Sequence, residues 1–114
     1  MKKVCVVTGT RAEYGLLKPV IDKLHRAEDL ELQLVATGAH LSPEFGLTYK
    51  EIEADGYPIT EKVEMLLSSD TAVGITKSMA VALMGFGECF DRLKPDMVVI
   101  LGDRYEMLMV ASAA

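Results

Sequence analysis

The stretch Met97-Val98-Val99-Ile100-Leu101-Gly102-Asp103-Arg104-Tyr105-Glu106 decides the fold of this chain. Its continuous apolar run predicts a strand of a parallel sheet that is covered on both faces. The glycine, the acid and the base that follow lie where the chain leaves the carboxyl end of that strand, which is where open α/β sheets bind ligands. Asp103 and Arg104 are therefore candidates for contact with a ligand, and a helix is expected directly after them.

The first residues of the chain repeat this order of features. Val4-Cys5-Val6-Val7-Thr8 is a second apolar run without alternation, a glycine follows it, and Thr10 can cap a helix that begins near Ala12. If the two strands are parallel neighbours, both junctions face one crevice. Each junction would then contribute one arginine, Arg11 or Arg104.

Arg11 has two interpretations. A guanidinium offers a fork of donors that fits phosphate oxygens, and the amide N–H groups of a helix N-terminus can hold an anion. The surrounding Thr8-Gly9-Thr10-Arg11 is, however, neither a Walker loop nor a GxGxxG fingerprint. The alternative is a surface arginine paired with Glu13 or with another acid, and the sequence favours neither interpretation.

Asp103 and His40 also have two interpretations each. Asp103 is either the cap of the helix that follows it or a general acid/base or substrate-hydroxyl ligand at a strand end, and pairing with Arg104 would lower its pKa. His40 lies in the loop 38–46, at the carboxyl end of another expected strand. A single histidine in such a loop is most often a hydrogen-bonded loop residue, so this structural role stands slightly ahead of ligand contact.

Hydrophobic periodicity predicts alternating strands and helices along the whole chain. We expect strands at 3–8, 30–37, 59–65 and 97–101, and helices at about 12–26, 48–54, 71–93 and from 106 onward. The expected buried stripes are Leu16, Leu17, Val20, Ile21 and Leu24 in the first helix and Ile75, Met79, Ala82, Leu83, Phe86, Phe90 and Leu93 in the third. This series predicts an α/β protein with a doubly wound parallel sheet, flanked by helices, in which strand 97–101 is an edge.

The bulk composition is that of one globular domain. The 114 residues are 50% hydrophobic and 25% charged, and a formal net charge of -5 without any lysine and arginine block argues against a nucleic-acid partner. No apolar run approaches the ~20 residues of a membrane span. Cys5 and Cys89 form no CxxC pair, and we expect reduced, buried thiols in a cytoplasmic protein.

The last expected helix is unusual. Residues 106–114 are nearly all apolar and carry neither a cap nor a polar face. Strand 97–101 would also be a hydrophobic edge, which invites pairing. We therefore expect residues 1–114 to be the first part of a longer protein.

Four segments stand out together: Val-Thr-Gly-Thr-Arg-Ala-Glu-Tyr-Gly (7–15), Val-Ala-Thr-Gly-Ala-His-Leu (35–41), Phe-Gly-Leu-Thr-Tyr (45–49) and the stretch 93–106. In this order they resemble one known family, the hydrolysing UDP-N-acetylglucosamine 2-epimerases. The resemblance implies two Rossmann-like domains in the GT-B arrangement, with the active site between them and residues 1–114 as most of the first domain. It implies that UDP is eliminated from a UDP-2-acetamido sugar and that water adds to the resulting glycal. The C2-epimerised free sugar, such as N-acetylmannosamine, would then feed sialic or legionaminic acid synthesis.

The resemblance also assigns roles to individual residues. Asp103 looks like the active-site aspartate of the family, and Arg11 and Arg104 look like its ligands for UDP. His40 matches a loop histidine on the substrate side of the cleft. Thr10 and Gly15 of the opening segment are further expected substrate contacts. A homo-oligomer is implied, and neither a metal nor a redox cofactor is.

Three alternatives remain open on the sequence. The first is a non-hydrolysing epimerase, although Ala12 and Arg104 favour the hydrolysing branch, and the second is a GT-B glycosyltransferase. The third is a non-catalytic fragment that folds or assembles through its exposed edge and its last helix. The further catalytic carboxylates and the uridine pocket of the family would lie beyond residue 114, so residues 1–114 alone are expected to be inactive.

Overall fold

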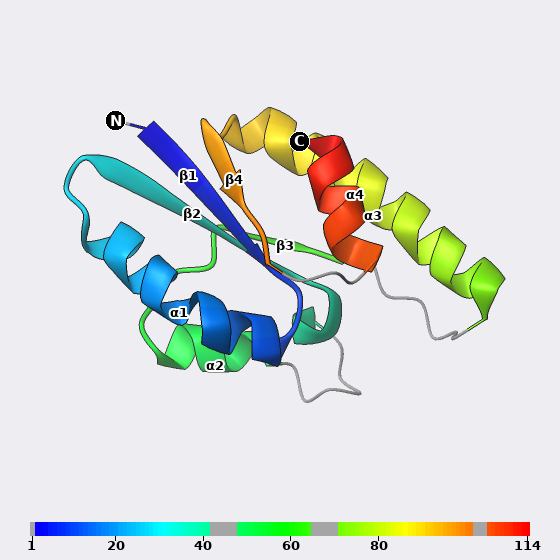
Figure 1. The fold of residues 1–114 in the computed structure, drawn as a ribbon, viewed down its shortest axis with the longest axis horizontal. Helices are drawn as coiled ribbons and strands as arrows, with labels where there is room; N and C mark the ends of the chain where they lie inside the picture. Colours follow the sequence, from blue (N-terminus) through cyan, green and yellow to red (C-terminus); the bar gives the residue numbers. More distant parts are fainter. Residues whose placement is uncertain (1, 42–47, 65–70, 102–104) are drawn as a thin grey trace.

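The computed structural model describes residues 2–41, 48–64, 71–101 and 105–114, and these form a four-stranded parallel sheet with helices on both faces (Figure 1). The strands are β1 (Lys2–Thr8), β2 (Leu30–Thr37), β3 (Glu61–Val63) and β4 (Met97–Val99), in the order β3-β2-β1-β4. The helices are α1 (Arg11–Arg26), the 3-10 helix η1 (Gly38–Leu41), α2 (Tyr49–Ala54), α3 (Ala72–Leu93) and α4 (Tyr105–Ala113). The predicted parallel α/β sheet, with its fourth strand at an edge, is confirmed.

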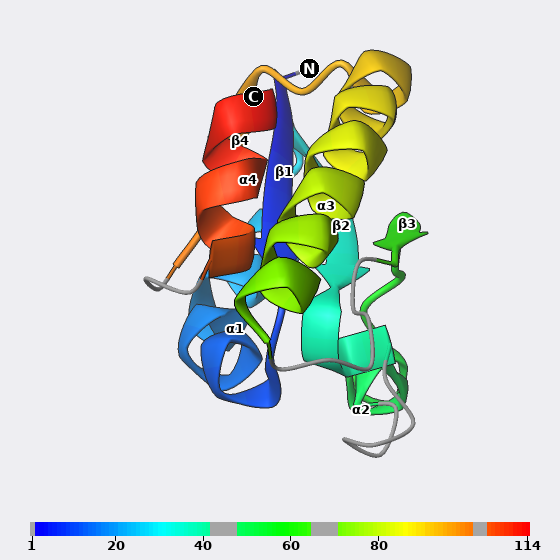
Figure 2. The ribbon, with the colours of Figure 1, turned by 90° about the vertical axis from the view of Figure 1, so that its right-hand side faces the viewer.

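The strand order reverses direction at β1. The chain runs outward from β1 through β2 to β3 with α1 and α2 on one face, and α3 then carries it back to β4 on the other side of β1. The helices α3 and α4 cover the opposite face of the sheet (Figure 2). Val6 of β1 is paired with Leu34 of β2 and with Val99 of β4, so β1 and β4 are parallel neighbours, as predicted. Open α/β sheets bind ligands at such a reversal, beyond the carboxyl ends of the strands.

Each face of the sheet has its own apolar core. The core under α1 and α2 contains Val6, Tyr14, Leu17, Ile21, Leu34, Ile52 and Tyr57, and the core under α3 and α4 contains Cys5, Val7, Val35, Val63, Ala82, Phe86, Cys89, Phe90, Met107 and Val110. Cys5 and Cys89 are free, fully buried thiols, as expected. Burial raises the pKa of Cys5 to about 12 and that of Cys89 to about 11, so both thiols stay protonated and unreactive near neutral pH.

The buried stripe of α1 differs from the predicted one. Tyr14, Leu17 and Ile21 face the sheet, whereas Leu16 is 72% exposed and Val20 is 42% exposed. A helix that buries positions 14, 17 and 21 turns positions 16 and 20 away from the core, because successive residues are rotated by about 100°. The sequence offered two overlapping apolar stripes, and the aromatic ring of Tyr14 belongs to the one that is buried.

The long helix α3 is also rotated slightly from the expected stripe. Leu83 is 42% exposed, while Cys89 and Ser78 are buried. The N-cap of α3 is Thr71, whose Oγ1 accepts the Gly74 N–H at 3.0 Å. A Cβ on Gly85 would lie 2.8 Å from Cγ1 of Val63, so this glycine allows α3 to pack closely on β3.

The outer strands are shorter than predicted. β3 covers Glu61–Val63 rather than 59–65, and β4 ends at Val99 rather than at residue 101. Both strands are at an edge of the sheet, where only one neighbour supplies hydrogen bonds. Gly38–Leu41, predicted as a loop, forms the short 3-10 helix η1.

By length and composition alone, α3 could cross a membrane. Its apolar side chains have another use in this fold, because Ala82, Phe86 and Phe90 belong to the core beneath α3 and α4. The helix is therefore explained as the core helix of an α/β unit.

Candidate functional site

The carboxyl ends of the central strands bring the first candidate residues together. β1 ends at Thr8 and β2 ends at Thr37, and the backbones that follow them approach closely. Gly38 has φ +60, and a Cβ on it would lie 2.9 Å from the carbonyl oxygen of Gly9. Only a glycine fits this conformation and this contact without strain. The segments that contain Thr10 and His40 therefore meet at one edge of the sheet.

Two side chains fix the start of α1. Thr10 is the N-cap, and its Oγ1 accepts the N–H of Glu13 at 3.2 Å. Oε1 of Glu13 in turn accepts the N–H of Gly9 at 3.0 Å, a variant of the reciprocal capping box. The first amide N–H groups of a helix have no partner within the helix. The residues between Gly9 and Glu13 thus present fixed amide N–H groups at the carboxyl edge, and such groups can bind an anion.

Arg11 is an exposed cation at this edge. Its side chain is 72% exposed, and Nε donates to Oε2 of Glu51 on α2 at 2.8 Å. Glu13, the partner suggested by sequence, is instead engaged with Gly9, so Arg11 pairs with an acid 40 residues away. An exposed ion pair of this kind contributes about 0–1 kcal/mol. A doubly charged phosphate group could therefore compete for the guanidinium, and binding of UDP by Arg11 stays a prediction.

His40 is built into the protein interior. Its ring is fully buried, Nε2 lies 2.9 Å from Oγ1 of Thr8, and Nδ1 lies 2.8 Å from Oγ1 of Thr48. The ring of Tyr14 packs edge-on against it, with centroids 6.3 Å apart. Burial lowers the pKa of His40 to about 4, and it outweighs the smaller opposing effects of the Thr10 backbone and the charge of Glu51. A neutral imidazole with both nitrogens engaged matches the structural role favoured by the sequence, whereas direct ligand contact stays a prediction.

The remaining predicted site residues are Gly15, Asp103 and Arg104. Gly15 lies exposed on α1, and a Cβ there would meet nothing within 4 Å, so no steric contact within the described residues requires a glycine. Asp103 and Arg104 lie outside the described residues. β4, which precedes them in the sequence, ends at Val99 opposite Val6, near the end of β1.

Several polar residues of this edge were not singled out by the sequence. Thr8 and Thr48 hold the ring of His40, and Glu51 holds Arg11. Their sequence neighbours give no indication of these roles, because Thr8 and Glu51 meet partners 32 and 40 residues away, and Thr48 reaches His40 only through the folding of the segment between them. The only local signal was a threonine at the end of an apolar strand, which is an unusual place for a hydroxyl unless it has a partner.

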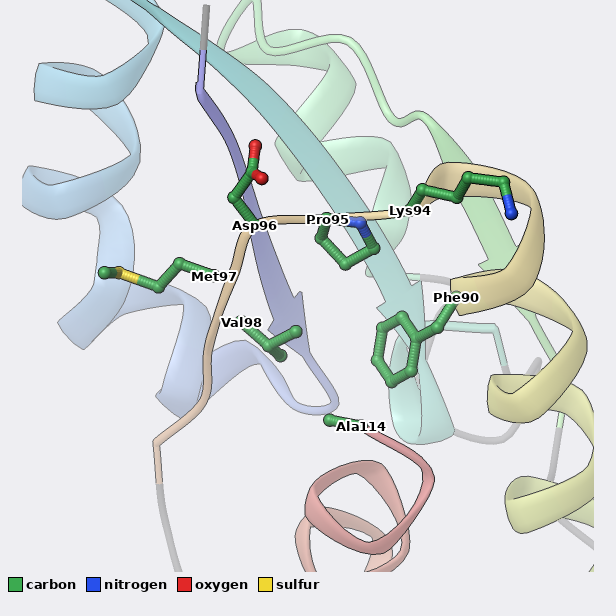
Figure 3. Close-up of a pocket in the computed structure, with 7 residues that line it drawn as sticks. All are labelled: Phe90, Lys94, Pro95, Asp96, Met97, Val98 and Ala114. Carbon is green, nitrogen blue, oxygen red and sulfur yellow. The ribbon is translucent and has the colours of Figure 1, made fainter.

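The opposite end of the sheet carries a pocket of about 440 Å³ (Figure 3). It is lined by Phe90, Lys94, Pro95, Asp96, Met97, Val98 and Ala114. Asp96 bonds the amide of Lys3, at the start of β1, so this pocket lies at the amino end of the strands. Among the described residues, no group of three histidine, cysteine or acidic side chains could hold a metal ion.

The fold and this edge define a class of protein. The parallel sheet with helices on both faces, whose strand order reverses at β1, is a doubly wound α/β fold, a class that binds ligands beyond the carboxyl ends of its strands. Residues 22–114 match the UDP-N-acetylglucosamine 2-epimerase family, and the chain belongs to this family.

Known relatives show how much of such a protein is present. The chain is 56% identical over 97% of its length to the GDP/UDP-N,N'-diacetylbacillosamine 2-epimerase (hydrolyzing) of Campylobacter jejuni. It is 41% identical over its whole length to the UDP-N,N'-diacetylbacillosamine 2-epimerase (hydrolyzing) of Legionella pneumophila. It spans only 29% and 30% of these two proteins, respectively.

A solved structure confirms the fold. The chain superposes on the UDP-GlcNAc 2-epimerase of Neisseria meningitidis, solved with UDP-GlcNAc, with a TM-score of 0.80 and 18% identity, over 97% of this chain and 28% of that one. The predicted Rossmann-like sheet, as part of the GT-B-type fold of these enzymes, is therefore confirmed.

Proposed function

We propose that residues 1–114 form most of the N-terminal domain of a hydrolysing UDP-sugar 2-epimerase. The observation that carries the proposal is the 56% identity, over 97% of this chain, to an enzyme named for this hydrolysing reaction. The carboxyl edge of the sheet is consistent with it, because Arg11 and the capped start of α1 offer donors to a diphosphate. The remainder of this domain and a second domain would follow residue 114.

The substrate in this proposal is a UDP-2-acetamido sugar. UDP-N-acetylglucosamine and its 4-acetamido-6-deoxy analogue both satisfy the resemblance in the sequence. Two relatives of this chain are named for N,N'-diacetylbacillosamine nucleotides, at 56% and 41% identity, which favours the 4-acetamido-6-deoxy sugar. The free product would be the C2-epimerised sugar, used in sialic or legionaminic acid synthesis in the cytoplasm.

The proposed reaction has two steps. A base removes the proton from C2 of the sugar while the bond between C1 and the diphosphate oxygen breaks, so that UDP leaves and a glycal forms. Water then adds across C1 and C2, with the hydroxyl on C1 and a proton delivered to the opposite face of C2. The acid/base work needs a positioned carboxylate, and the departure of UDP needs cationic groups.

Individual residues take the following parts in the proposal. Asp103 is the acid/base or sugar-hydroxyl ligand, and Arg11 and Arg104 bind the diphosphate. Thr10 contributes the capped helix start, and Gly15 leaves the surface of α1 open to substrate. Residues 1–114 alone would be inactive, because the other catalytic carboxylates lie further along the chain. The whole enzyme is proposed to be a homo-oligomer.

The test uses the full-length protein in deuterium oxide, followed by proton NMR, with UDP-N-acetylglucosamine and UDP-N,N'-diacetylbacillosamine as parallel substrates. We expect release of UDP and of a free, C2-epimerised sugar that carries deuterium at C2. Asp103→Asn should abolish both signals. A C2-epimerised sugar that remains attached to UDP would show a non-hydrolysing epimerase instead. Sugar transfer to an added acceptor without change at C2 would show a glycosyltransferase.

A further inference from the structure

The ring of His40 joins three segments at the carboxyl edge. Nε2 meets Oγ1 of Thr8 at the end of β1, and Nδ1 meets Oγ1 of Thr48 just before α2. The ring of Tyr14, from α1, closes a third side. A fully buried histidine with partners on three elements is a point of attachment between them rather than a surface group.

The hydrogen bonds around the ring have one consistent direction. Oγ1 of Thr8 lies 3.4 Å from the carbonyl oxygen of Thr10, to which it donates. With that proton engaged, Oγ1 of Thr8 accepts its bond from Nε2 of His40, and the hydrogen bond between the His40 ring and the Thr10 backbone, which raises the pKa of His40, agrees with a proton on this nitrogen. Nδ1 is then unprotonated and accepts the hydroxyl proton of Thr48. The neutral tautomer with the proton on Nε2 is the one this network assigns.

This chain of bonds ends on the peptide that opens α1. The carbonyl of Thr10 receives the hydroxyl of Thr8 and also the N–H of Tyr14, at 3.0 Å, the first helical bond of α1. Because a peptide unit is planar, fixing this carbonyl also fixes the N–H of Arg11, which points the opposite way. The ring of His40 is thus linked, through Thr8, to the peptide that carries the Arg11 N–H.

We propose that His40 is a positioning residue: through Thr8 it orients the Thr10–Arg11 peptide for the diphosphate of the substrate, while Thr48 holds the ring in place. This inference rests on the proposed function, because it assumes that the diphosphate binds at this helix start. His40 acts without touching the ligand. The close approach of Gly38 to Gly9 supports this proposal, because the segment that carries His40 lies against the segment that leads into α1.

The first test is the protonation state of His40 in the full-length, ligand-free protein, read from imidazole ¹⁵N shifts between pH 5.5 and 8.5. The groups that act on the ring are the Thr10 backbone and Glu51 of α2, which both raise its pKa, and Tyr14, whose ring stands nearly perpendicular to it. We expect the Nε2–H neutral form throughout this range. A ring that titrates near pH 6.5, or that carries its proton on Nδ1, would overturn the proposal.

The second test is a matched pair of variants at Thr48. Thr48→Val removes the hydroxyl at nearly constant volume, and Thr48→Ser keeps it. We expect Thr48→Val to weaken UDP binding by roughly 5-fold, as the loss of one net hydrogen bond would. Thr48→Ser should restore binding to near the original value. Equal affinity in the two variants would contradict the positioning role.

The two proposals fail separately. A protein that eliminates UDP from no UDP-2-acetamido sugar would refute the proposed function, whereas the ring state of the ligand-free protein is measured without any substrate. If Thr48→Val does not fold, the ¹⁵N measurement on the unaltered protein still decides whether the network around His40 has the stated direction.

Discussion

The two ends of the sheet are built differently. At the carboxyl end, polar side chains are taken into the interior: His40, Thr8 and Thr37 are fully buried and Glu13 nearly so. At the amino end, an open pocket is lined by apolar groups together with Lys94 and Asp96, both exposed. The pocket and the buried polar side chains thus lie at opposite ends of the strands.

This difference favours the carboxyl end as the candidate binding site. Burying a polar group costs free energy unless its hydrogen bonds are satisfied, so a protein core does not gain stability by choosing such residues over apolar ones. The carboxylate of Glu13 accepts the amide N–H of Gly9, and the ring of His40 is hydrogen-bonded to two threonine hydroxyls. A pocket lined by exposed and apolar side chains needs no such buried hydrogen bonds. The carboxyl end, though less hollow, is the better candidate for the binding site.

The largest expected effect is an acid sensitivity that belongs to the carboxyl end. The pKa of His40 is lowered from 6.5 to about 4, so between these values the unfolded chain binds a proton that the folded chain does not. The contribution of His40 to the free energy of unfolding is complete above pH 6.5. It falls by roughly 3 kcal/mol as the pH is lowered toward 4. Urea unfolding at several pH values measures it. His40→Gln, which cannot titrate, should show a flatter dependence, and an unchanged slope would refute this assignment.

A second effect concerns the contact between the segments after β1 and β2. Gly38→Ala places a Cβ 2.9 Å from the Gly9 carbonyl oxygen at φ +60, and should lower the free energy of unfolding by about 1–3 kcal/mol. Gly15→Ala is the matched control, because nothing lies within 4 Å and alanine favours a helix by up to ~1 kcal/mol. Thermal unfolding of both variants separates the two cases. Equal midpoints would mean that the close approach does not constrain this edge.

A smaller effect concerns ligand affinity. Glu51→Gln removes the carboxylate that competes for Arg11, so UDP should bind roughly 2- to 5-fold more tightly. Glu53→Gln makes the same change of charge on the same helix without involving Arg11. Calorimetric titration of the full-length variants with UDP distinguishes a specific release of Arg11 from a general effect of net charge. The same gain in both variants would point to net charge alone.

The smallest effect is expected at the amino end. Asp96 accepts the N–H of Lys3 at 2.8 Å on the exposed surface, and Asp96→Asn keeps an oxygen for this bond. Stability should change by less than about 0.5 kcal/mol, and UDP affinity should not change. A clear loss of UDP binding in this variant would move the binding site toward the pocket.

The elements could be predicted from the sequence because their signals are local. Apolar runs gave the central strands to within a residue, and the long apolar periodicity gave α1 and α3. The buried faces were harder, since Leu16 and Val20 form a second apolar stripe on α1 that the fold leaves exposed. Which of two stripes is buried depends on the neighbouring elements, and a single helix does not carry that information.

The candidate site was predictable in position and not in detail. Arg11 and His40 were recognised because they follow strands, which places them at the carboxyl edge whatever their partners are. The partners themselves, Glu51 and Thr48, depend on where α2 settles against the start of α1. The burial of His40 likewise needs three segments at once. Asp103 and Arg104 lie outside the described residues, so their roles stay predictions.

The most direct test is to map UDP binding onto the two ends of the sheet. Amide ¹H–¹⁵N spectra of the full-length protein would be recorded during titration with UDP. We predict that the amides of residues 9–12, at the start of α1, shift with a common saturation curve, while those of residues 94–98, in the pocket at the amino end, stay in place. Shifts confined to residues 94–98 would contradict the account.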